Sequence, residues 1–131
     1  MRFEQNVEDR FTVFKLMEEK LDSRISPAVK HEFTQLNFRG NRNLILDLSD
    51  VKYVDSSGLS AILTANRLCT STNGILVVCG INDHVRKLME ISRLNDVLNL
   101  VSTEEEAREA VFMSEIEKEI VDDAGGEPEL N

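Results

Sequence analysis

The chain has 131 residues, which is enough for one domain with its own hydrophobic core. Hydrophobic residues make up 41% of it, yet there are only six Phe, one Tyr and no Trp, so the core must be mainly aliphatic, as in layered α/β folds. A formal net charge of −9 disfavours binding to nucleic acid, because phosphates need a basic surface.

The first elements predicted along the chain are two strands joined as a hairpin. Residues 3–7 and 11–17 have the pattern of strands, and residues 8–10 supply the polar turn between them. No Asn-Gly or Asp-Gly pair fixes the type of this turn.

A helix is predicted next. Ser26 followed by Pro27 is a good helix start, because a capping side chain precedes a residue with a preset φ angle. The helix ends near Phe38, and Gly40 closes it. One apolar stripe runs along it, formed by Ile25, Val29, Phe33 and Leu36.

The central stretch of the chain combines a buried strand with a long helix. Residues 44–48 are apolar apart from Asp47, which is typical of a buried strand. After residues 51–54, the sequence DSSG at positions 55–58 leads into a segment with apolar side chains at helical spacing. These side chains are Leu59, Ala61, Ile62, Leu63, Ala65 and Leu68.

The start of this central helix is a candidate anion site. Ser and Asp at a helix start accept hydrogen bonds from free backbone amides, and the same end carries the positive pole of the helix dipole, so a phosphate can be held there. Gly58 and Ser60 are small enough to bring the first turn close to the sheet or to a partner. A simpler interpretation is that Ser56 and Ser57 only cap the helix and that Gly58 only fits a tight turn. Local composition alone favours that interpretation.

Strands and helices continue to alternate after residue 70. Residues 75–79 form a second apolar run that Gly80 ends, Asn82 or Asp83 can cap a third helix, and residues 97–101 predict a short final strand. The alternation predicts an α/β fold with a mixed, mostly parallel sheet of about five strands and four main helices.

The last helix is expected to start at Ser102 or Thr103, with Thr103 and Glu106 as a capping box. Its apolar stripe predicts that it continues to about Val121. Residues 113–131 hold seven acids against one lysine, and residues 122–131 are too polar and too rich in Gly and Pro to pack, so we expect them to be disordered. The stripe consists of Ala107, Ala110, Val111, Phe112, Ile116 and Ile120.

In this arrangement the chain resembles the STAS domains of the anti-sigma factor antagonist family, the phosphorylatable switch proteins of bacterial partner-switching systems. NLILDLSDVKYVDSSGLSAIL is similar to the family's strand, loop and helix around its Asp-Ser-Ser/Thr-Gly-Leu signature, and NGILVVCGINDHVRKLMEISRL to the strand and helix that follow. Residues 20–22 match the acidic loop before the first helix. The resemblance covers about residues 5–112. It outweighs the capping-only interpretation of Ser56, and we expect a STAS domain at 1–112 and an acidic helical extension and tail at 113–131.

The resemblance implies that Ser56 takes a phosphoryl group and that Ser57 stays unmodified. The dephosphorylated protein would bind an anti-sigma factor serine kinase of the histidine-kinase-like ATPase fold and so free a sigma factor. That kinase would phosphorylate Ser56 with ATP, and a metal-dependent, PP2C-type phosphatase would reverse the reaction. The protein would be a monomer or weak dimer, and no enzyme. Its partner contacts would be Asp22, Asp55, Ser57, Gly58 and Leu59.

Two residues depart from the family's pattern. Glu19 stands where the family usually has Gly, just before the acidic loop, so an added charge can alter which partner fits. Arg93 replaces a common Gly after the third helix. The acidic extension is also longer than a minimal STAS domain, and it either packs on its own core or acts as a docking or dimer segment.

Competing functions have weaker support. A hydrolase would need a nucleophile elbow, but the flanks of Ser56 are not GxSxG, and only His31 and His84 could act as bases. No Walker loop or metal-ligand cluster is present, so we expect no cofactor and no metal. A stronger alternative is a STAS scaffold or sensor with an output other than a sigma factor.

The remaining features predict a cytoplasmic protein that does not bind a membrane. No segment approaches the roughly 18 consecutive apolar residues of a membrane span, and the N-terminal residues lack a signal-peptide core. Cys69 and Cys79 lie in apolar segments without CxxC spacing, which indicates buried thiols in a reducing compartment.

Overall fold

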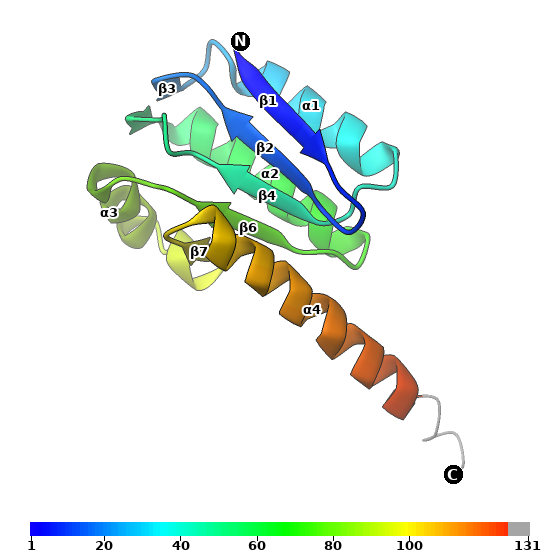
Figure 1. Ribbon diagram of the computed structural model, residues 1–131. Coiled ribbons are helices and arrows are strands. Elements are labelled where there is room, and N and C mark those ends of the chain that lie inside the picture. The colour runs from blue at the N-terminus through cyan, green and yellow to red at the C-terminus, as the bar shows by residue number, and fades with distance from the viewer. Residues whose placement is uncertain (126–131) are drawn as a thin grey trace.

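The computed structural model describes residues 1–125, with side chains as far as Val121 (Figure 1). Its centre is a five-stranded sheet in the order β1-β2-β4-β6-β7. The β1–β2 pair is antiparallel and the other three pairs are parallel, which confirms the predicted mixed, mostly parallel sheet. The strands are β1 (Phe3–Val7), β2 (Thr12–Leu16), β4 (Leu44–Asp47), β6 (Leu76–Cys79) and β7 (Asn99–Val101).

Helices cover both faces of this sheet (Figure 1). The larger core lies between one face and α1 (Ser26–Phe38), α2 (Ser56–Ser71) and α3 (Asp83–Ile91). A smaller core lies on the other face, under the first half of α4 (Glu104–Gly125), where Ala107 and Val111 pack against Val13, Ile45 and Val77. All four helices were predicted, because each has an apolar stripe at helical spacing.

A second, two-stranded sheet was not predicted. β3 (Lys20–Leu21) pairs in parallel with β5 (Tyr53–Val54), so part of the expected acidic loop is a strand. The backbone amide of Asp55 extends the pairing by donating to the carbonyl of Leu21 at 3.2 Å. This small sheet therefore ties the segment before α1 to the segment before α2.

Three predicted helix caps can be compared with the structure outside the central helix, and two are right and one is wrong. Thr103 and Glu106 form the capping box, with Glu106 N donating to Thr103 Oγ1 at 3.1 Å, and Asn82 caps α3. The prediction that Ser26 caps α1 is wrong, because Ile25 occupies the N-cap position and makes no side-chain cap bond. The Ser26 hydroxyl donates instead to the carbonyl of Asp22 at 2.7 Å.

The chain between α3 and β7 also differs from the prediction. A short 3-10 helix, η1 (Leu94–Asp96), fills the turn, so β7 begins at Asn99 and Val97 is exposed. Arg93, which stands where the resembled family commonly has Gly, has φ 61° and ψ 22°. This left-handed conformation favours glycine, which gives the family's preference a physical reason.

The C-terminal helix is longer than predicted. α4 continues past Val121 to Gly125, so the prediction of disorder is wrong for residues 122–125, and its remainder, 126–131, lies outside the described residues. The helix crosses the expected boundary at residue 112 without a break. Phe112 and Ile120 are both 62% exposed, so the predicted stripe does not pack on the core along its whole length.

Both cysteines are buried thiols without a disulfide, as predicted. Burial raises the pKa of each thiol to about 12, which leaves both uncharged and unreactive at neutral pH. Among the helices of the described residues, none combines the length and the apolar character that a membrane span needs.

Candidate functional site

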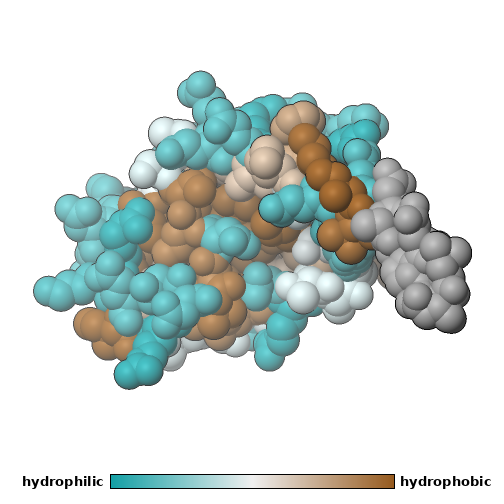
Figure 2. Space-filling model, turned by 90° about the horizontal axis from the view of Figure 1, so that it is seen from below, coloured by the Kyte–Doolittle hydropathy of each residue, from teal (hydrophilic) through white to brown (hydrophobic). Residues whose placement is uncertain are grey.

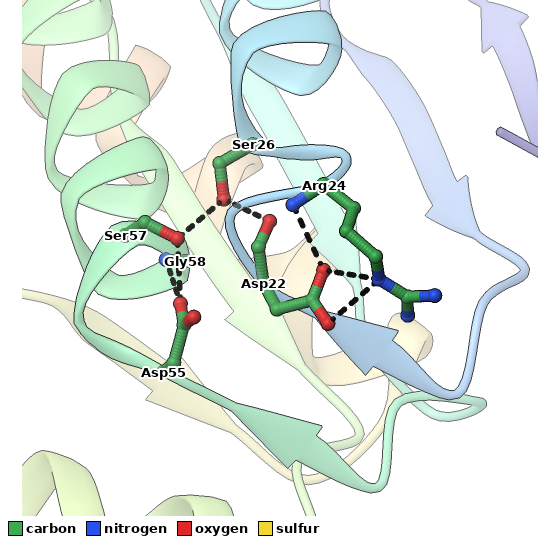
Figure 3. Close-up of polar contacts among 6 residues, drawn as sticks. All are labelled: Asp22, Arg24, Ser26, Asp55, Ser57 and Gly58. Atoms are coloured by element: carbon green, nitrogen blue, oxygen red, sulfur yellow. Dashed lines mark hydrogen bonds and ion pairs between the residues drawn. The ribbon is translucent and has the colours of Figure 1, made fainter.

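Asp55 caps the helix at the start of the candidate site. It lies in an extended conformation directly after β5, and its Oδ1 atom accepts a hydrogen bond from the backbone amide of Gly58 at 2.9 Å (Figure 3). The interpretation in which Ser56 and Ser57 merely cap the helix is therefore wrong, because the aspartate before them already does so. Both serines are helical residues in the first turn of α2.

The Ser57 hydroxyl is fully engaged inside the site. Ser57 Oγ donates to Asp55 Oδ1 at 2.6 Å and lies 3.2 Å from Ser26 Oγ (Figure 3). Ser26 Oγ already donates to the carbonyl of Asp22 at 2.7 Å. Each hydroxyl has a single proton, so the contact between the two serines adds no further hydrogen bond while both protons are used in this way. Ser57 is half-buried between the starts of α1 and α2.

The Ser56 hydroxyl is free by contrast. Its residue is exposed, and within residues 1–121 the hydroxyl makes no hydrogen bond. Ser56 is the first residue of α2, where backbone amides and the helix dipole favour negative charge. Of two adjacent serines, only one therefore presents a hydroxyl that another molecule can reach without breaking an internal contact.

The two aspartates of the site are both held in the charged state. The side chain of Arg24 hydrogen-bonds to Asp22 through its Nε atom, at 3.2 Å from Oδ1 and 3.1 Å from Oδ2, and lowers the pKa of that carboxyl (Figure 3). The hydroxyl of Ser57, followed by the amide of Gly58, lowers the pKa of Asp55. A second anion at Ser56 would therefore stand next to a carboxylate that remains ionised at neutral pH.

Gly58 and Leu59 lie in the interior. A Cβ atom at Gly58 would stand 2.3 Å from the carbonyl oxygen of Leu21 and 2.8 Å from Cγ1 of Val54, so the first turn of α2 rests directly on β3 and β5. Leu59 is 9% exposed and belongs to the larger core. In the free protein these two residues shape the turn, whereas Ser56 is exposed and Asp22 and Asp55 are half-buried.

Sequence reasoning missed two residues of this site. Arg24 lies only two positions after Asp22, so the ion pair between them could have been predicted from the sequence. The contact between Ser26 and Ser57 joins residues that are 31 positions apart, and no local sequence pattern predicts it.

The candidate bases of a hydrolase are not part of the site. His31 and His84 are exposed, and His84 stacks on Tyr53 with ring centroids 6.3 Å apart. Neither histidine hydrogen-bonds to Ser56 or Ser57 in the part of the chain that the structure describes. The described residues also contain no group of three or more His, Cys, Asp or Glu side chains placed to hold a metal ion.

Comparison with known proteins shows the family of this chain. The STAS domain family model matches residues 2–107. This chain belongs to the STAS domain family. Among curated proteins, the STAS chain is similar to the anti-sigma-B factor antagonist of Staphylococcus aureus, with 26% identity over 100 residues that cover 76% of this chain and 92% of that one.

Solved structures with the same fold include a protein of Thermotoga maritima and SpoIIAA. A crystal structure of a Thermotoga maritima protein has a TM-score of 0.75 at 26% identity and covers 83% of this STAS chain and 93% of that one. The unphosphorylated form of SpoIIAA, an anti-sigma factor antagonist, has a TM-score of 0.67 at 21% identity and covers 84% of this chain and 97% of that one. SpoIIAA of Bacillus has also been solved in a phosphorylated form.

Proposed function

We propose that this protein is an anti-sigma factor antagonist that phosphorylation of Ser56 switches off. In the dephosphorylated state it binds an anti-sigma factor serine kinase of the histidine-kinase-like ATPase fold, and the sigma factor held by that kinase is released. The observation that carries the proposal is the exposed, unengaged hydroxyl of Ser56, placed between the capping Asp55 and the engaged Ser57. The family membership and the curated relatives support the choice of partner.

The phosphoryl group is expected on Ser56 and not on Ser57. In the transfer, a serine Oγ attacks the γ-phosphorus of ATP, ADP leaves, and a base of the kinase takes the hydroxyl proton. The Ser57 hydroxyl already donates its proton to Asp55, with 2.6 Å between Oγ and Oδ1, and its oxygen lies 3.2 Å from Ser26 Oγ. Ser56 has neither constraint, so its hydroxyl can enter the active site of a kinase without any internal contact of this protein being broken first.

The fold is expected to tolerate the phosphate. Of the first four backbone amides of α2, those of Gly58 and Leu59 donate to Asp55 and that of Ser57 also stabilises its carboxylate, whereas that of Ser56 makes no hydrogen bond within residues 1–121. Free amides and the helix dipole offset the negative charge of a group at this position. The modified protein should therefore keep its structure.

We expect that the complex with the anti-sigma factor does not tolerate the phosphate on Ser56. Phosphorylation adds about −1.5 to −2 charges and three acceptor oxygens. In a tight interface this group would lose water beside Asp55 and Asp22, both of which are ionised. Each 1.4 kcal/mol of lost affinity weakens binding about tenfold, so a modest penalty is enough to release the partner. A PP2C-type phosphatase would restore binding by hydrolysing the ester and releasing inorganic phosphate.

Phosphosite mapping tests this proposal. The full chain is incubated with a candidate anti-sigma factor kinase encoded nearby and with Mg²⁺ and ATP, and the products are analysed by mass spectrometry. We expect one phosphate on Ser56, unchanged labelling of Ser57→Ala, and no labelling of Ser56→Ala. Transfer to Ser57, or continued labelling of Ser56→Ala, would overturn the assignment.

A further inference from the structure

The second half of α4 turns its polar side toward the body of the protein. Glu115 is only 8% exposed, and its Oε1 atom accepts a hydrogen bond from Arg42 Nη2 at 2.8 Å. Lys118 donates to the backbone carbonyl of Asn73. Arg42 and Asn73 belong to the loops that precede β4 and β6, so polar contacts attach this half of the helix to one end of the sheet.

Apolar side chains of the same half point to solvent. Phe112, Ile116 and Ile120 follow one another four positions apart and therefore line up along the helix, with Met113 beside them. We call these four residues the α4 stripe. Phe112, Met113 and Ile120 are 62%, 52% and 62% exposed, and Ile116 between them is half-buried. Figure 2 shows hydrophobic surface on the side of the molecule where the second half of α4 lies.

This arrangement is the reverse of an ordinary surface helix, which packs its apolar side on the core and leaves its polar side in water. A continuous apolar strip on an exposed helix is typical of a protein contact surface. The charges around the strip indicate what kind of contact. Glu109 and Glu117 are exposed along its borders, and Glu119, also exposed, pairs with Arg10 at 3.7 Å. Lys118 is held on the inner side by the Asn73 carbonyl.

We propose that the α4 stripe is a docking surface for a basic amphipathic helix of another protein. The apolar face of that helix would cover Phe112, Met113, Ile116 and Ile120, and its flanking Lys or Arg side chains would meet the border glutamates. A second copy of this chain fits less well, because two such helices would bring glutamates against glutamates.

The α4 stripe is remote from Ser56. Ser56 begins α2, and Asn73, the residue that holds Lys118, lies just beyond the other end of that helix. Sixteen helical residues at 1.5 Å each separate the two ends by about 24 Å. Docking on the stripe is therefore expected to be independent of phosphorylation, and both partners can be bound at once.

A peptide titration tests the proposal. The probe is a fluorescent synthetic helix with leucines at i, i+3, i+4 and i+7 and lysines elsewhere, and its binding to the full chain is followed by fluorescence anisotropy. The test variant is Phe112→Gln with Ile120→Gln. The matched control is Phe38→Gln with Ile91→Gln, which makes the same two changes at residues that are 87% and 73% exposed on α1 and α3. We expect at least tenfold weaker binding for the test variant and less than twofold change for the control.

Charge variants provide an independent measurement. Glu109→Gln with Glu117→Gln should weaken binding several-fold and reduce its salt dependence, and a probe with glutamates in place of lysines should not bind. Equal affinities of the test and control variants for the lysine probe would overturn the proposal. So would self-association in analytical ultracentrifugation that only the Phe112/Ile120 variant abolishes, or stripe-dependent binding to vesicles of anionic lipid. Ser56→Asp should leave the peptide affinity unchanged, so this test does not depend on the switch.

Discussion

The two ends of α2 differ in the kind of group that is left exposed. At its start, Ser57 donates to Asp55 and Ser26 donates to the carbonyl of Asp22, and the group left over is the hydroxyl of Ser56. Beyond its far end, Arg42 and Asn73 hold the polar side of α4, and the groups left over are the apolar side chains of the α4 stripe. In each region, the internal contacts decide which kind of group remains for another molecule.

The difference determines how each surface can be controlled. A hydroxyl at a helix start can gain a phosphate, and the added charge can end a contact without disturbing the fold. An apolar strip has no such group, so its occupancy depends only on the concentration and affinity of its partner. On these proposals, phosphorylation controls the contact at Ser56 and leaves the contact at the α4 stripe unchanged.

The largest expected effect on stability comes from adding a side chain at Gly58, in the first turn of α2. Gly58→Ala would place a Cβ atom 2.3 Å from the Leu21 carbonyl oxygen, and the backbone of β3 or α2 would have to move. We expect the free energy of unfolding to fall by about 3 kcal/mol, measured by urea denaturation.

Gly40→Ala is the matched control for this change. Gly40 has a φ angle of +95°, but a Cβ atom there would meet nothing within 4 Å. Its cost should be the backbone strain alone, about 1 kcal/mol. If the free energy of unfolding falls by the same amount in both variants, the close contact between α2 and β3 does not hold the first turn of α2 in place.

A smaller effect is expected from the charge of Asp55. Its pKa in the folded protein lies below the ordinary 3.8, chiefly because the Ser57 hydroxyl and the Gly58 amide bind the carboxylate. This contribution to stability is complete above pH 3.8 and is lost as the pH falls through the lower folded value. Asp55→Asn keeps an oxygen for both donors but removes the charge. The stability difference between wild type and variant, measured by urea denaturation, should therefore shrink as the pH is lowered from 6 to 2.5, and a difference that does not change with pH would contradict the assignment.

The sequence was sufficient for the features that local patterns encode. Apolar periodicity predicted the five strands of the main sheet and all four main helices, and side-chain chemistry predicted the caps at Asn82 and Thr103. It also singled out the segment at residues 55–58. These features depend on neighbours within a few positions of one another.

The features that sequence reasoning missed depend on distant partners. The β3–β5 ladder is two residues long in each strand, too short to show a period, and it exists because Leu21 meets Val54. Ser26 was wrongly predicted as a cap because the Asp22 carbonyl captures its hydroxyl. The outward direction of the α4 stripe follows from the contacts of Glu115 with Arg42 and of Lys118 with Asn73, 73 and 45 positions apart.

The central claim is that one added charge at Ser56 ends the contact with the anti-sigma factor while the protein stays folded. The most direct test is to titrate the purified anti-sigma factor with Ser56→Asp, Ser56→Ala and Thr70→Asp by isothermal calorimetry. Thr70→Asp adds the same charge at the far end of the same helix, on an exposed residue. We predict wild-type affinity for Ser56→Ala and Thr70→Asp, and at least hundredfold weaker binding for Ser56→Asp, equivalent to about 2.7 kcal/mol. Equal affinities of Ser56→Asp and Ser56→Ala would contradict the account.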